Sequence, residues 1–125
     1  MSLDYAISDA VEIVYYTDSD SISVNGKHVM RNVPAKILRN ILSEYTTTGR
    51  EEFENREFKR DTSICMDPLH PNFESRLNRV VAHIEGRKVN GEITNNGLKN
   101  FFEIDRYRRG GFRFIPKCNI VFREE

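Results

Sequence analysis

Apolar and polar residues alternate along the first quarter of the chain, which is the pattern of β-strands whose two faces meet different surroundings. The alternation runs through residues 11–16 and 21–24, which are rich in β-branched and aromatic side chains. Asn25 and Gly26 then form a typical hairpin turn into residues 27–30. The pattern predicts that the chain opens with a small antiparallel sheet.

Helical periodicity replaces this alternation after Pro34, a residue suited to the first turn of a helix. One apolar stripe predicts the first core helix, which Gly49 ends; its members are Ile37, Leu38, Ile41, Leu42 and Tyr45. Residues 50–60 are strongly charged but contain two phenylalanines, and we expect them to dock on the core as a short second helix. The two prolines of residues 61–71 predict a loop.

Residues 72–86 predict a third helix, because their apolar residues recur at intervals of three and four. Asn72 is suited to cap its start, and Gly86 lies near its end. The inward stripe is Leu77, Val80, Val81 and Ile84. If that stripe faces the core, the outward face carries Ser75, Asn78, Arg79, Ala82 and Gly86, with Arg76 and His83 on one flank.

The end of the chain returns to a strand pattern. Residues 101–105 and 111–115 predict the two arms of a hairpin, and residues 119–122 predict a last short strand. Gly110 and Gly111 lie at the hairpin turn, where residues with positive φ are required. The order of the elements therefore predicts an α+β domain over residues 11–125, preceded by a linker or tail over residues 1–10.

Charge changes this picture, because the formal net charge of zero hides an asymmetry. Residues 1–70 hold 8 Lys and Arg against 12 Asp and Glu, whereas residues 71–125 hold 11 against 7. The basic residues gather in the third helix and the hairpin, which indicates one basic face rather than a basic protein.

The hairpin itself carries several arginines, namely Arg106, Arg108, Arg109 and Arg113. Glu103 and Asp105 are their only expected local counter-charges. Crowded arginines repel one another, so a cluster of them often binds an anion. Arginine, asparagine and serine on the outward face of the helix are residues that hydrogen-bond base edges and phosphates. The alternatives are a solvated helix face and a hairpin whose arginines serve solubility.

Catalytic and metal sites are not predicted. The three histidines are scattered, and the pair Cys65 and His70 lacks further ligands at zinc-like spacing. No phosphate-binding loop or nucleophile elbow is present. Two distant cysteines and an N-terminus without a signal-peptide pattern favour a cytoplasmic protein, and no apolar run approaches the length needed to span a membrane. We expect no cofactor and no enzyme activity.

The hairpin also resembles a known family. Ile104, Asp105, Arg108, Gly111 and Phe112, followed by Arg113 and Phe114, match without a gap the terminal pattern of OmpR/PhoB-type DNA-binding effector domains of bacterial response regulators. The third helix resembles the recognition helix of that family, and residues 22–42 resemble its strand, turn, strand and first helix. The resemblance covers residues 11–115 and implies a winged helix-turn-helix fold with an N-terminal antiparallel sheet, three helices and a C-terminal hairpin wing.

The resemblance implies that the chain binds duplex DNA and regulates transcription. Helix 72–86 would enter the major groove and wing 101–115 would contact the adjacent backbone or minor groove. The expected DNA-binding residues are Ser75, Arg76, Asn78, Arg79, His83, Arg87, Arg106, Arg108 and Arg109; Arg79 and Asn78 would read bases, and Arg76, His83 and Arg87 would contact phosphates. Loop 61–71 would contact RNA polymerase. The chain would be either a stand-alone regulator or the effector part of a longer protein that carries a receiver or sensor domain. A winged-helix protein-interaction module without DNA binding is the main alternative, and a small nuclease is a weaker one.

Overall fold

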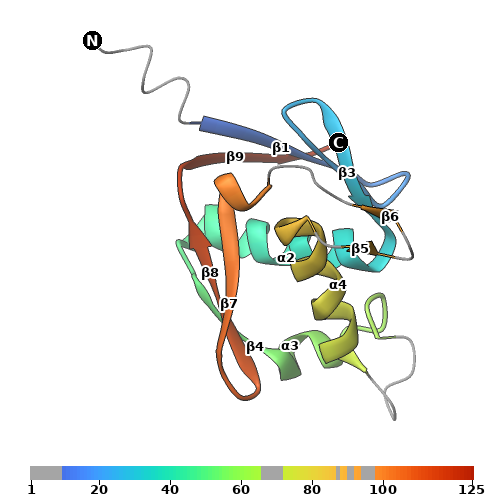
Figure 1. Cartoon of the computed structure of the whole chain (residues 1–125), viewed down its shortest axis with the longest axis vertical. Coiled ribbons are helices and arrows are strands. Elements are labelled where there is room, and N and C mark those ends of the chain that lie inside the picture. The colour runs from blue at the N-terminus through green and yellow to red at the C-terminus, as the bar shows by residue number, and fades with distance from the viewer. Residues whose placement is uncertain (1–9, 66–71, 87, 90–91, 94–97) are drawn as a thin grey trace.

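A mixed four-stranded sheet forms one layer of the molecule (Figure 1). The computed structural model describes residues 10–65, 72–86, 88–89, 92–93 and 98–125. Strands β1 (Ala10–Tyr16), β2 (Ser21–Val24) and β3 (Lys27–Arg31) form the predicted antiparallel part, and β9 (Asn119–Glu124) completes the order β3-β2-β1-β9. Because β9 pairs with β1 in parallel, the complete sheet is mixed, although its N-terminal part is antiparallel as predicted.

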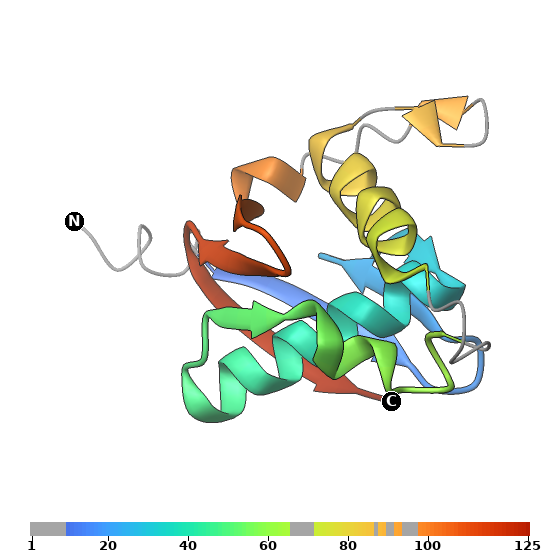
Figure 2. The same cartoon turned by 90° about the horizontal axis from the view of Figure 1, so that it is seen from below.

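Helix α2 (Asn32–Thr48) covers the inner face of this sheet. Figure 2 shows it lying across the strands. Four members of the predicted apolar stripe, Ile37, Leu38, Ile41 and Leu42, have no exposed surface, and the fifth, Tyr45, is partly buried against the core. Gly49 ends the helix with a φ of 78°, and its amide donates to the carbonyl oxygen of Tyr45 over 2.8 Å.

The charged segment 50–60 is divided between a strand and a helix, whereas the sequence predicted one helix. Residues Glu52–Glu54 form β4, and residues Asn55–Lys59 form α3. A capping box between Glu54 and Glu57 starts the helix. The two phenylalanines of the segment enter the core as expected.

Helix α4 (Phe73–Glu85) packs against α2 and α3 and confirms the predicted third helix. Its inward stripe is buried as expected. Asn72 stands at the N-cap position with a φ of 44°, but its side chain makes no capping hydrogen bond. The short strands β5 (Lys88–Val89) and β6 (Glu92–Ile93) pair with each other beyond the end of α4, and the 3-10 helix η1 (Leu98–Asn100) follows.

The predicted hairpin is formed by β7 (Phe102–Arg108) and β8 (Gly111–Pro116). It belongs to a second sheet of order β4-β8-β7, in which Phe53 of β4 lies opposite Phe112. Stacking between these two rings, whose centroids are 5.5 Å apart, links the hairpin to the core. The described residues thus form an α+β fold with three α-helices, none of which is long and apolar enough to span a membrane.

Candidate nucleic-acid interface

The exposed face of α4 is polar. Ser75, Asn78 and Arg79 are exposed, as the helical periodicity predicted. Arg79 makes no ion pair with any described residue. Ala82 was expected on this face but is only 8% exposed. The outward face is therefore shorter than predicted.

The flank of α4 is half-buried at both predicted positions. The Nε atom of Arg76 is buried, and its guanidinium lies close enough to Cys65 to oppose the rise that burial causes in the pKa of that thiol. Arg76 is therefore turned toward the segment after α3 rather than toward solvent. The predicted phosphate ligand Arg87 lies outside the described residues.

His83 occupies the other half-buried flank position. Its Nδ1 atom is buried and has no hydrogen-bond partner among the described residues. Burial lowers the pKa of His83, and the positive charges of His28 and Arg79 lower it further. A neutral imidazole is a weak ligand for phosphate, so its surroundings disfavour the role predicted for it.

The hairpin places Arg106, Arg108 and Arg109 on its surface, and all three are exposed. Arg109 and Gly110 form the turn between the paired residues Arg108 and Gly111. Arg109 makes no ion pair with a described residue. Arg106 donates a hydrogen bond from Nη1 to Oδ1 of Asn78, which joins β7 to the exposed face of α4.

Strand β4 brings two carboxylates to the hairpin that the sequence did not assign to it. Glu52 accepts a hydrogen bond from the hydroxyl of Tyr107 and lies 3.9 Å from Arg113, whereas Glu54 lies 4.0 Å from Arg108. The hydrogen bond from Tyr107 lowers the pKa of Glu52. The expectation that Glu103 and Asp105 are the only counter-charges was wrong, because a three-residue strand has too little periodicity to be recognised.

A small pocket of about 170 Å³ lies where the hairpin meets α3 and α4. Its lining comprises Asn55, Glu74, Leu77, Arg106, Arg108, Gly110 and Gly111. The amide of Asn55 donates to the carbonyl oxygen of Gly110 over 2.9 Å, so the first residue of α3 supports the tip of the hairpin. The pocket thus lies between α4 and the hairpin, the two elements that the sequence predicted to form one interface.

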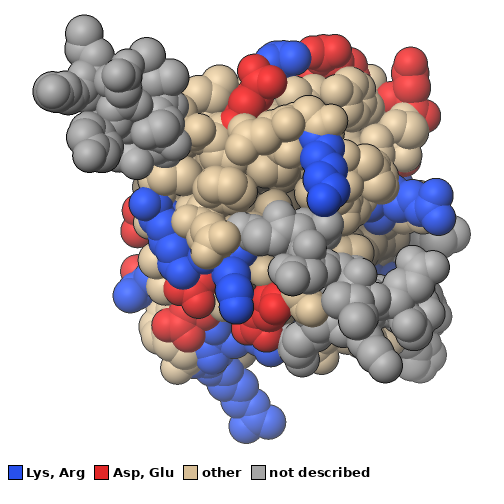
Figure 3. Space-filling view, turned by 45° about the horizontal axis from the view of Figure 1, so that its top comes forward, with Lys and Arg blue, Asp and Glu red and all other residues tan. Residues whose placement is uncertain are grey.

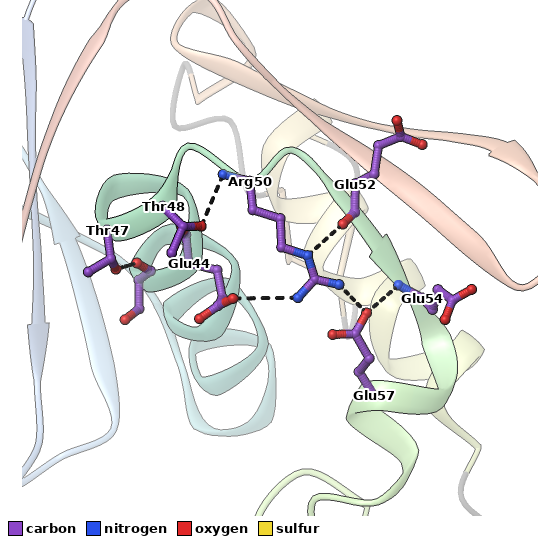
Figure 4. Close-up of polar contacts among 8 residues, drawn as sticks. Glu44, Thr47, Thr48, Arg50, Glu52, Glu54 and Glu57 are labelled. Atoms are coloured by element: carbon purple, nitrogen blue, oxygen red, sulfur yellow. Dashed lines mark hydrogen bonds and ion pairs between the residues drawn. The ribbon is translucent and has the colours of Figure 1, made fainter.

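Arg50 fixes β4 in this position (Figure 4). Its Nε atom donates to the carbonyl oxygen of Glu52 over 2.9 Å, and its terminal nitrogens contact the carboxylates of Glu44 and Glu57. The guanidinium also lies 4.6 Å from the centre of the Phe53 ring. A larger pocket of about 380 Å³ adjoins this network on the side of α2, away from the hairpin tip.

The segments predicted to contact other partners lie only partly within the described residues. The loop expected to contact RNA polymerase is described from Asp61 to Cys65, and the rest of it lies outside the described residues. The predicted linker also lies outside them, except for Ala10, which begins β1. No three histidine, cysteine, aspartate or glutamate residues in the described part of the chain are grouped to hold a metal ion. A comparison with protein-family models, curated proteins and solved structures finds no match to this chain.

Proposed function

We propose that the chain is a winged helix-turn-helix domain that binds duplex DNA and regulates transcription. In this proposal α4 lies in the major groove with Ser75, Asn78 and Arg79 toward the base edges, and the arginines of the β7–β8 hairpin contact the adjacent backbone or minor groove. The observation that carries the proposal is the hydrogen bond between Asn78 and Arg106, because it brings the helix face and the hairpin together on one arginine-bearing surface.

The order and pairing of the elements support the fold part of the proposal. Helix α2, strand β4, helices α3 and α4, and a hairpin that pairs with β4 follow one another in the layout of a winged helix. The preceding β1–β3 meander supports the narrower resemblance to OmpR/PhoB-type effector domains. That resemblance also motivates the proposals of an RNA polymerase contact through residues 61–71 and of a receiver or sensor domain in a longer chain. The cytoplasmic location is proposed from the two distant cysteines and the N-terminal sequence.

The burial of the flank residues of α4 reduces the number of residues that we propose to contact DNA. Arg79, Arg106 and Arg109 are exposed and make no ion pair with a described residue, whereas Arg76 is turned inward and Arg108 lies near Glu54. We assign the strongest phosphate and base contacts to the first three arginines. Because fewer cations are free than the sequence predicted, DNA binding should release fewer counterions and should depend less on salt concentration.

The test is a titration of a fluorescent duplex at several salt concentrations. With about four phosphates neutralised, the logarithm of the association constant should fall with the logarithm of salt concentration with a slope of about −3.6. Binding of random duplex should be weak at physiological salt. An absence of binding at low salt, or binding that does not respond to salt, would contradict the proposal.

A protein-interaction module with the same fold is the second candidate. Its support is the partial neutralisation of the hairpin by Glu52 and Glu54, and on the face in Figure 3 basic and acidic side chains are interspersed. Substitution of both glutamates by glutamine separates the candidates. DNA affinity should rise if the hairpin meets phosphates, because two repulsive charges are removed. An interaction module should show no DNA binding before or after the change.

A further inference from the structure

The hydrogen bond between α4 and the hairpin fixes which way the side-chain amide of Asn78 points. Arg106 donates from Nη1 to the oxygen of that amide. A guanidinium contains only donors, so the oxygen of Asn78, and not its nitrogen, must face Arg106. The NH₂ group of Asn78 is consequently the part of the amide directed away from the hairpin.

This orientation affects base recognition. Asparagine usually recognises adenine by a bidentate pair, in which the oxygen accepts from N6 and the nitrogen donates to N7. The oxygen of Asn78 already accepts from a cationic donor, which leaves it one lone pair, whereas its NH₂ group and the remaining N–H groups of Arg106 are all donors. Both side chains are exposed, so these donors can reach a ligand. A surface on which donors outnumber acceptors in this way is complementary to two adjacent acceptors.

We infer that Asn78 and Arg106 act together as a specificity-determining pair that recognises guanine, whose major-groove edge presents the two acceptors O6 and N7. This inference rests on the proposed function, since it names the base edge that the same surface recognises. Each partner has a distinct role: Arg106 fixes the amide and adds donors, and Asn78 supplies the NH₂ group from the helix.

The test compares the sites that the protein selects from a pool of randomised duplexes. The wild-type protein should select guanine at one position over adenine by about tenfold or more, as expected for a bidentate pair. Arg106→Met removes the donors and leaves the amide of Asn78 free to rotate. The preference for guanine at that position should then be lost, and adenine should become equally good or better.

Arg109→Met is the matched control. It removes the same charge from the same hairpin, but the hydrogen bond to Asn78 comes from Arg106 and is kept. It should weaken binding to all duplexes while retaining the guanine preference. Asn78→Ala should lose the preference at the same position as Arg106→Met. Urea unfolding of each variant checks that the fold is retained.

The outcomes distinguish the inference from the proposed function. If the wild-type protein binds no duplex at low salt, the proposed function fails and the inference fails with it. If it binds and selects sites, but Arg106→Met or Asn78→Ala leaves every base preference unchanged, the inference alone is overturned. A wild-type preference for adenine at the position that Asn78→Ala affects would also overturn it.

Discussion

Gly110 and Gly111 are adjacent at the hairpin turn but are required for different reasons. Gly110 has a φ of 77° in open surroundings, so only its backbone conformation favours glycine. Gly111 has no such φ, but a Cβ there would overlap the guanidinium of Arg108. One glycine therefore permits the turn, and the other allows an arginine to lie across the strand.

Alanine substitutions should separate these two requirements. We expect Gly110→Ala to destabilise the protein by about 1 kcal/mol, because an alanine must adopt a left-handed conformation. Gly111→Ala should change stability by no more than about 0.5 kcal/mol, because the mobile end of Arg108 can move away. Urea unfolding of both variants is the measurement. A larger cost at Gly111 would mean that the position of Arg108 is held more rigidly than its exposed contacts indicate.

His83 should make the stability of the protein depend on pH. Its pKa is lowered in the folded state, mainly by burial, so the unfolded chain binds a proton more readily. Stability should therefore be fully present above the unfolded pKa of about 6.5 and should fall as the pH decreases below it. Glu52, Glu57 and Glu74, whose pKa values are also lowered, lose their contributions only at more acidic pH.

The measurement is the free energy of unfolding at pH 7.5 and pH 5.5. The wild-type protein should be less stable at the lower pH, and His83→Gln should reduce that difference. His28→Gln is the matched control, because it removes a positive neighbour of His83 but keeps the buried imidazole; part of the difference should remain. An equal pH dependence in the wild-type protein and His83→Gln would contradict the assignment.

At the scale of elements, the helices and the hairpin could be predicted because their signals are local. Ile37 to Leu42 repeat at helical spacing, and Phe112 and Phe114 alternate with polar residues in the hairpin arm. Strand β4 could not be predicted, because its three residues carry no period and it exists only by pairing with β8. The parallel pairing of β1 with β9 could not be predicted either, because β9 lies more than a hundred residues later in the chain.

The distinction between local signals and contacts of distant segments also applies to the candidate site. The exposure of Asn78 and Arg79 follows from the helical period. The counter-charges of the hairpin depend on β4, which is distant from the hairpin in the sequence. Contacts between distant segments therefore decide which of the predicted cations remain free.

Helix and hairpin should contribute differently to DNA binding under the proposed function. Arg79→Ala should lower affinity for the preferred site by about 1 to 3 kcal/mol and affinity for random duplex much less, because it removes a base contact. Arg109→Ala should weaken binding to both duplexes alike and make the salt slope smaller by about one unit, because it removes a phosphate contact. Both residues are exposed, so the stability of either variant should stay within about 0.5 kcal/mol of wild type.

Affinities for both duplexes at two salt concentrations provide the comparison, and urea unfolding provides the control for folding. Arg109 is better suited than Arg108 to represent the hairpin, because Arg108 also donates to the hydroxyl of Tyr107 over 3.2 Å and lies near Glu54. If Arg109→Ala leaves every affinity unchanged in a folded protein, the hairpin does not contact DNA, and the protein-interaction candidate gains support.

At the scale of the whole molecule, the chain path makes the two sheets depend on each other. Strand β8 belongs to the hairpin sheet and leads directly into β9, which pairs with β1 from Ala10↔Asn119 to Tyr15↔Glu124. An ion pair of 2.9 Å between Arg39 of α2 and Glu124 connects the same strand to the helix. We therefore expect the two sheets to unfold in one cooperative transition rather than separately.

Adjacent residues of β9 provide the test, because they face opposite sides of the sheet. Phe122 packs against the core, whereas Val121 is 52% exposed on the outer face. Phe122→Ala should destabilise the protein by about 2 kcal/mol, and Val121→Thr by no more than about 0.5 kcal/mol. Amide hydrogen exchange should accelerate in β7 and β8 as well as in β1 when Phe122 is replaced, since global unfolding exposes all of them. Acceleration confined to the sheet that contains β1 would show instead that the hairpin sheet unfolds independently.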